Sequence, residues 1–128
     1  MTAPRFEPGP EIAGPRVQGF AGDAFLIGGE LYDGVLLTPE RAERWQAPAL
    51  ARLEADDVAP LLALVPPPEF LILGTGAAQR FPPRAFIAAL DERGIGVEAM
   101  DSRAAARIWG LLRGEGRWIA AALMPLEK

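Results

Sequence analysis

Two groups of polar and charged side chains each follow an apolar run of this sequence. The first group follows the run 70–73 and contains Thr75, Gln79, Arg80 and Arg84. The second follows the run 95–100 and contains Asp101, Ser102, Arg103 and Arg107, with the two arginines four residues apart on one helix face. If the runs are neighbouring parallel strands, both groups lie at the same end of the sheet, outside the carboxyl ends of the strands, where α/β proteins usually bind ligands. The pattern predicts a pocket for an anion or a small polar molecule around the loop Gly74–Arg84.

Two alternatives explain the same residues differently. The arginines can form a solvated rim that pairs with nearby acids, namely Asp91, Glu92 and Glu98. The order strand, Gly74-Thr75-Gly76, helix, strand and Asp101 is also the order of a dinucleotide-binding fold. That order is a weak match, because Gln79 stands at the third glycine position and the helix starts too late to receive a pyrophosphate. Asp101 is equally well explained as a helix N-cap.

Composition excludes more functional classes than any motif adds. The 128 residues include no cysteine and no histidine, which excludes disulfides, thiolate chemistry, imidazole bases and nearly all zinc or non-haem iron sites. A net charge of −4 provides no general attraction for nucleic acid or an anionic membrane. The apolar window 58–78 is interrupted by four prolines and does not predict a membrane span. We therefore expect no cofactor, no nucleic-acid partner and no membrane insertion.

Proline and glycine divide the chain into a tail and one domain. Residues 1–15 contain four prolines and two glycines and are predicted to be a flexible tail. No change in composition divides residues 16–128, which are predicted to form a single α/β domain. The order of its elements is an N-terminal β-hairpin region followed by β-α-β-α-β.

The hairpin region is predicted from glycine pairs between apolar runs. Gly28-Gly29 lies between Ala24–Ile27 and Val35–Leu37, and its freedom to adopt positive φ angles suits a tight hairpin turn. Asp33-Gly34 predicts a second turn or a bulge in the returning strand. Thr38–Arg41 predicts a short helical turn, because proline is favoured at the first helical position.

Trp45 and Asp56 belong to the connection between the hairpin region and the second half. Trp45 is predicted to anchor the core, because a large aromatic side chain is more often packed there than used to stack on a ligand. Asp56 is predicted to cap a helix from Asp57 to about Leu64. The unalternated apolar run 70–73 then predicts a strand that is covered on both faces.

The second half alternates helix and strand. A helix opened by Pro83 is expected to bury Phe86, Ile87 and Leu90 and to stop at Gly94. Glu98 predicts that the following strand lies at a sheet edge. The next helix ends near Arg113 and is expected to bury Ala104, Ala105, Ile108, Leu111 and Leu112. Gly110, within that helix, is explained by close approach to a strand, and the run 118–124 predicts a central final strand.

The motifs of this sequence resemble a known family. They are Phe70–Gly76, Phe81-Pro82-Pro83, Gly94–Glu98 with Met100-Asp101-Ser102, Ala105–Arg107, and Glu115-Gly116-Arg117 leading into 120–123. The hairpin region and Trp45 fit as well, so the match covers about residues 16–126. The chain resembles the small α/β domain family of mitochondrial respiratory complex I (NADH dehydrogenase) assembly factor 3 and its uncharacterised bacterial and archaeal relatives.

The resemblance implies both a fold and a role. The fold is a three-layer α/β domain around a mixed five-stranded sheet, with the last strand in the middle and antiparallel to its neighbours. The sequence departs from the family at Ile108-Trp109-Gly110, where relatives usually carry Thr-Tyr-Asn. Chemistry that needs that hydroxyl and amide cannot operate here, so the departure favours a scaffold over an enzyme.

These observations lead to one expected function and one alternative. We expect a non-catalytic cytoplasmic domain, a monomer or weak homo-oligomer, that binds protein partners in the biogenesis of a membrane complex. The alternative is a small-molecule-binding or anion-binding protein, or an unrecognised enzyme, that uses the loop Gly74–Arg84.

Overall fold

The last strand of the chain lies at the centre of the main sheet. The computed structural model describes residues 13–127. The main sheet has the order β5-β4-β8-β6-β7 and consists of β4 (Val35–Leu37), β5 (Ala42–Arg44), β6 (Phe70–Gly74), β7 (Gly96–Met100) and β8 (Ala120–Leu123). A separate three-stranded antiparallel sheet consists of β1 (Val17–Ala21), β2 (Ala24–Ile27) and β3 (Glu30–Tyr32).

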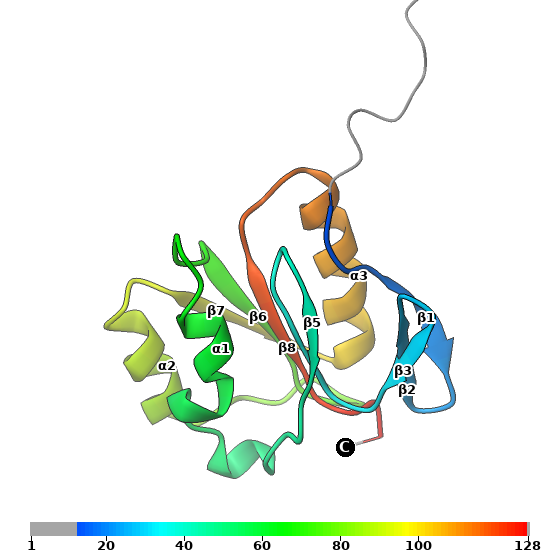
Figure 1. Cartoon of the computed structure of the whole chain (residues 1–128). Helices are drawn as coiled ribbons and strands as arrows, with labels where there is room; N and C mark the ends of the chain where they lie inside the picture. The colour runs from blue at the N-terminus through cyan, green and yellow to red at the C-terminus, as the bar shows by residue number, and fades with distance from the viewer. Residues whose placement is uncertain (1–12, 128) are drawn as a thin grey trace, which may run out of the picture.

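Three layers form because each face of the main sheet is covered. The short helix α1 (Ala59–Leu62) and α2 (Arg84–Asp91) lie on one face, and α3 (Ser102–Gly114) lies on the other with the small sheet beside it (Figure 1). This confirms the predicted three-layer α/β fold around a mixed five-stranded sheet. Glu98 is exposed on β7, which confirms the predicted edge position.

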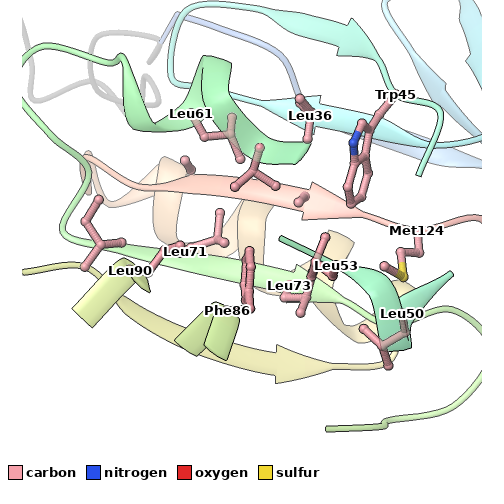
Figure 2. Close-up of a cluster of buried hydrophobic side chains, with 14 residues drawn as sticks. Leu36, Trp45, Leu50, Leu53, Leu61, Leu71, Leu73, Phe86, Leu90 and Met124 are labelled. Carbon is pink, nitrogen blue, oxygen red and sulfur yellow. The ribbon is translucent and has the colours of Figure 1, made fainter. Parts of the chain in front are cut away.

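Successive side chains of the central strands point to opposite faces of the main sheet, which gives two separate hydrophobic cores. On β6, Leu71 and Leu73 pack toward α2, while Ile72 packs toward α3. Figure 2 shows the first core, in which Leu71 and Leu73 lie near Phe86 and Leu90 of α2. Because both faces are buried, the strands read as continuous apolar runs.

The direction of β8 corrects one expectation. The final strand is central, as expected, but it is antiparallel only to β4 and runs parallel to β6. The reason is topological: α3 crosses back over the sheet, so β8 enters from the same end as β6 and β7. The carboxyl ends of the three parallel strands β6, β7 and β8 therefore lie at the same end of the sheet.

The first half forms three antiparallel hairpins, β1–β2, β2–β3 and β4–β5. Gly28 and Gly29 have φ angles of 59° and 80°, which confirms the predicted tight turn. The returning strand is β3, however, and the expected return along Val35–Leu37 was wrong. Asp33-Gly34 is a turn that passes the chain into the main sheet, where the fully buried β4 is covered on both faces.

Local hydrogen bonds correct two expected helix starts. Thr38 accepts the Arg41 N–H on its Oγ1 at 3.0 Å and donates its own N–H to the Arg41 carbonyl at 2.9 Å. The segment Thr38–Arg41 is therefore the turn of a hairpin between β4 and β5, and no helix forms there. The helix expected from Asp57 to about Leu64 instead starts with a 3₁₀ turn at Ala55–Val58, capped by Glu54 and not by Asp56, and α1 ends at Leu62. A second 3₁₀ turn covers Leu50–Arg52.

The buried faces of α2 and α3 differ partly from the expected ones. On α2, Phe86 and Leu90 are buried as predicted, but Ile87 is 36% exposed. On α3 the buried residues are Ser102, Ala105, Ala106, Trp109 and Arg113. The expected stripe was rotated because it followed apolarity alone, whereas Ser102 and Arg113 are buried with internal hydrogen bonds.

Three bonds fasten the start of the described chain to α3. The Trp109 indole donates to the Pro15 carbonyl at 2.9 Å, and Arg113 donates to the Ala13 carbonyl at 3.3 Å. Arg16 donates to the Gly110 carbonyl at 3.4 Å. The predicted flexible tail otherwise falls on residues 1–12, outside the described range.

A Cβ at Gly110 would meet no atom within 4 Å, so the expected close approach there was wrong.

Candidate functional site

Two buried hydroxyl groups fasten the ends of β6, β7 and β8 to one another. Thr75 follows β6 and Ser102 follows β7, and neither residue is exposed. Because β6 and β7 are parallel, both hydroxyls lie at the same end of the sheet, beyond the carboxyl ends of the strands. We call the group formed by Gly74, Thr75, Gly76, Ser102 and Met124 the strand-end junction.

Thr75 shapes the loop that leaves β6. Its Oγ1 lies 2.7 Å from the Ala78 carbonyl oxygen and 3.2 Å from that of Met100, and it accepts the Arg80 N–H at 3.1 Å. Its backbone N–H donates to the Met100 carbonyl at 2.8 Å. The donor and acceptor capacity of this hydroxyl is therefore used inside the fold.

Ser102 joins the ends of β6 and β8. Its Oγ accepts the Gly76 N–H at 2.8 Å and donates to the Met124 carbonyl at 2.7 Å. Gly74 makes this approach possible, because a Cβ there would lie 2.7 Å from the Ser102 Oγ and 3.0 Å from its Cα. Gly76 has a φ of 99°, in the region that favours glycine.

Three more of the predicted ligand residues hold the surrounding backbone. Asp101 is the N-cap of α3 and accepts the Ala104 N–H on Oδ1 at 2.9 Å, which is the N-cap role foreseen for it. Gln79 donates to the Ala99 carbonyl at 3.2 Å. Arg80 donates from Nη2 to the carbonyl of Thr75 at 3.0 Å.

Three of the four predicted arginines lie on helices that cover opposite faces of the main sheet. Arg84 begins α2, whereas Arg103 and Arg107 are exposed on α3 across the sheet. The Arg103 guanidinium lies 5.5 Å from the ring centroid of Phe20. Within residues 13–127, no ion pair joins any of these arginines to an acid. The structure therefore brings Arg84 near Gln79 and leaves the α3 pair elsewhere.

A cleft of about 600 Å³ opens between the loop, α2 and β7. We call it the β7 cleft; its lining residues are Gln79, Phe81, Pro82, Arg84, Ile87, Val97, Glu98 and Ala99. Figure 1 shows α2 beside β7, the edge strand whose outer side forms one wall. Polar and apolar surface share the walls about equally, and Gln79, Arg84 and Glu98 supply the polar side chains.

Phe81 is the side chain that sequence reasoning missed. It is 87% exposed at the rim of the β7 cleft, beside the partly exposed Ile87. Burying a phenylalanine typically contributes about 1.5–3 kcal/mol, so its exposure leaves apolar surface available. A signal was present in the sequence: Phe81 stands between Arg80 and Pro82-Pro83, where neither a helix nor a strand can bury it.

The shifted pKa values lie away from the cleft and have structural causes. A hydrogen bond from Arg117, with a second from the Trp118 N–H, lowers the pKa of Glu69. The hydrogen bond to Glu69 and its negative charge in turn raise the pKa of Arg117. Burial, together with the nearby Arg16, lowers the pKa of Arg113. Glu69 thereby fastens the start of β6 to the segment before β8.

Two properties of the described residues concern metals and membranes. Between residues 13 and 127, no three acidic side chains gather closely enough to hold a metal ion. In the same range, no helix has the length and apolarity needed to cross a bilayer.

The sequence matches one family model over residues 17–124, that of proteins of unknown function designated DUF498/DUF598. The chain belongs to this family. It is 34% identical over 125 residues to an uncharacterised protein of Rhodobacter capsulatus, a match that covers 97% of this chain and 94% of that protein. These matches confirm the resemblance predicted from the motifs, including the uncharacterised bacterial relatives.

Solved structures share the fold of this DUF498/DUF598 domain. A crystal structure of a Bordetella parapertussis protein superposes with a TM-score of 0.80 at 28% identity, covering 91% of this chain and 99% of that one. A solution structure from Bordetella pertussis, described as an Mth938-like domain, gives 0.78 at 25% identity and covers 97% and 94%. One from Xanthomonas campestris gives 0.75 at 31% identity and covers 98% and 93%.

The motifs of this DUF498/DUF598 domain now have structural explanations. Gly74-Thr75-Gly76 and Ser102 build the strand-end junction, and Phe81-Pro82-Pro83 forms the rim of the β7 cleft and the start of α2. In the segment Ile108-Trp109-Gly110, the Trp109 ring is fully buried and its indole N–H donates to the Pro15 carbonyl. Trp109 therefore holds the N-terminal segment against α3 in this chain.

Proposed function

We propose that this DUF498/DUF598 domain is a non-catalytic, cytoplasmic protein-interaction domain that acts in the biogenesis of a membrane complex. One observation carries the proposal. The loop with the family motif uses its polar side chains for internal hydrogen bonds and displays a single aromatic side chain, Phe81, outward.

The internal bonds favour a scaffold. The hydroxyls of Thr75 and Ser102 are fully buried and already hydrogen bonded, so using either as a nucleophile requires breaking the strand-end junction. The cleft next to them combines an exposed aromatic ring with an arginine, and both residue types are enriched where proteins bind one another. The resemblance to a complex I assembly factor domain supports biogenesis as the process served.

Gene deletion with complementation tests the proposal. In the organism that encodes this chain, we expect deletion to lower the amount of assembled respiratory NADH dehydrogenase, measured by native electrophoresis and membrane NADH oxidation. The wild-type gene should restore assembly, and Phe81→Asp should not, because a charge at the cleft rim opposes apolar docking.

Leu31→Asp is the matched control. Leu31 is also an exposed apolar side chain, but it lies on β3 in the small sheet. The control should restore assembly like the wild type. Normal assembly in the deletion strain would end the biogenesis proposal, and equal failure of both variants would remove the role of the cleft.

A second candidate is a small-molecule-binding or anion-binding site in the same cleft. Its volume of about 600 Å³ falls within the range typical of ligand pockets, and Arg84 and Gln79 supply polar anchors beside apolar side chains. If an anion binds there, sulfate should raise the melting temperature more than chloride at equal ionic strength, beyond the general effect of sulfate on apolar burial. Arg84→Ala should remove that excess, whereas Arg103→Ala, on the other side of the sheet, should keep it. Equal responses of both variants would exclude this candidate.

A further inference from the structure

The outer edge of β7 faces the β7 cleft with main-chain groups that no residue of the described range 13–127 pairs. Along a strand, the N–H and C=O of successive residues point alternately to the two sides. The Met100 carbonyl accepts the Thr75 N–H on the β6 side, so Glu98 and Gly96 also face β6. The backbone groups of Val97 and Ala99 therefore point away from the sheet, and the Gln79 amide meets the Ala99 carbonyl there.

Three groups remain on this edge after the Gln79 bond is counted. They are the N–H and C=O of Val97 and the N–H of Ala99, which form no hydrogen bond with any part of the chain between residues 13 and 127. Val97 and Ala99 both line the cleft, so these groups open into it at the spacing of a strand. A ligand that satisfies all three needs donors and acceptors at the same spacing, which an extended peptide backbone provides.

We propose that a partner protein docks by adding an extended segment alongside β7, with an apolar side chain packed on Phe81 and Ile87. This inference rests on the proposed function and specifies its docking mode. Main-chain hydrogen bonds supply the attachment, as in other cases of strand addition, and the cleft supplies the preference for particular side chains.

Charges on the two sides of the edge define the sequence that fits. Val97 and Ala99 pack toward the core under α2, so Glu98 between them points to the α3 side. Arg84 lies on the α2 side of the same cleft. Neighbouring residues of an added strand also alternate between sides, so the segment that fits carries an acidic residue toward Arg84 and a basic residue next to it toward Glu98.

The same charges disfavour a second copy of this chain as the occupant. Two β7 strands paired about a two-fold axis keep their α3 sides together. The two Glu98 side chains then lie on one face, opposite one another or within two residues, and like charges at that spacing are destabilising. The partner is therefore a different protein.

Site-specific photocrosslinking in cells tests the proposal. p-Benzoylphenylalanine at position 81 should form an adduct with another protein, and the same probe at position 31 on β3 should not. In the position-81 protein, Val97→Pro should lower the adduct yield about tenfold, because it removes an outward N–H that strand addition requires. Val97→Ala is the matched control: it shortens the same side chain, keeps the N–H, and should lower the yield less than about twofold.

A second variant covers the case in which proline disturbs the fold. Proline is tolerated on an edge strand where its missing N–H faces outward, and equal melting temperatures of the two Val97 variants would confirm that here. Glu98→Lys changes only an exposed side chain and should lower the adduct yield about threefold. Glu92→Lys, just beyond the end of α2, should leave the yield unchanged.

Each result decides the question. Loss of the adduct in Val97→Pro and Glu98→Lys, but in neither control, supports strand addition. An adduct with this chain alone, an adduct insensitive to Val97→Pro and Glu98→Lys, or no adduct at position 81 overturns it. If Phe81→Asp fails in complementation while Val97→Pro restores assembly, the proposed function stands and strand addition falls; normal assembly in the deletion strain removes the function itself.

Discussion

The strand-end junction and the β7 cleft both arise from the segment Gly74–Arg84, a few residues apart. In the junction, buried hydroxyls are bonded to the ends of three strands, and glycine is required by close contact. In the cleft, an aromatic ring is exposed and a strand edge carries main-chain groups that residues 13–127 leave unpaired. The contrast teaches that one loop contains both a folding element and a candidate docking element, and substitutions should separate the two.

The largest expected effect contrasts two phenylalanines five residues apart. Phe86 is 1% exposed and packs in the core under α2, so Phe86→Ala should lower the free energy of unfolding by about 3–5 kcal/mol. Phe81→Ala should change it by less than about 0.5 kcal/mol, because its ring is in solvent. Denaturant unfolding measures both. A large loss for Phe81→Ala would show that the cleft rim stabilises the fold and would weaken the contrast.

Gly74→Ala should destabilise the protein by about 3 kcal/mol. The added methyl group would displace Ser102 and contact Leu123 at 3.1 Å, so it strains the packing and breaks a buried hydrogen bond. Gly96→Ala is the control, because a Cβ there would meet only Phe70, at an ordinary 3.9 Å. Its unfolding free energy should stay the same or rise slightly. Equal losses in the two variants would mean that the close approach at Gly74 relaxes at little cost.

Ser102→Ala should lower the free energy of unfolding by about 2 kcal/mol. It leaves the Gly76 N–H and the Met124 carbonyl without their buried partner. Asp101→Ala, one residue earlier, loses only the N-cap bond and should lower the free energy by about 1 kcal/mol. Thermal unfolding of both variants measures the difference. If Asp101→Ala proves the more damaging, the junction is not the stronger element.

The smallest effect concerns the opposite ends of β6 and β8. The pKa of Glu69 is lowered in the folded state by Arg117 and the Trp118 N–H, so its stabilising effect is present above the unfolded value of about 4.3. That contribution is lost as the pH falls through the lowered folded pKa. Glu69→Gln should therefore have a slightly lower melting temperature than the wild type at pH 7, and the difference should vanish in acid.

The control for this prediction is Glu92→Gln, just beyond the end of α2. Glu92 forms no ion pair within residues 13–127, so its substitution should leave the melting temperature nearly unchanged at both pH values. A Glu69→Gln difference that does not shrink as the pH falls below the unfolded pKa would contradict the assigned cause.

Much of the fold could be predicted because apolar residues in the second half of the chain follow simple helix and strand patterns. The unalternated runs of β6 and β8 indicated strands covered on both faces, and Glu98 indicated the edge. The first half was harder, since Val35–Leu37 is as apolar as β2 and only tertiary packing assigns it to the main sheet. Thr38 was misjudged because a threonine before a proline suits both a helix start and the hairpin turn that forms.

The candidate site was only partly readable. The sequence placed Thr75 and Ser102 at the same end of the sheet, because the two strands before them are parallel. It could not show that the Thr75 hydroxyl bonds to the end of β7 or that the Ser102 hydroxyl bonds to the loop after β6. The arginines were separated because α2 and α3 cover opposite faces, and residue spacing alone does not fix that. The β7 cleft depends on the path of the loop across β7, which no local pattern encodes.

The strand-end junction has a consequence for the thermodynamics of docking. Because Thr75 and Ser102 hold the carboxyl end of β7 against β6 and β8, this side of the proposed interface is ordered in the free protein. The backbone entropy lost on association then falls mainly on the incoming segment. Calorimetry of strand addition should show favourable enthalpy, opposing entropy and a negative heat-capacity change from burial of Phe81. Ser102→Ala, by loosening the receiving edge, should make the entropy term more unfavourable.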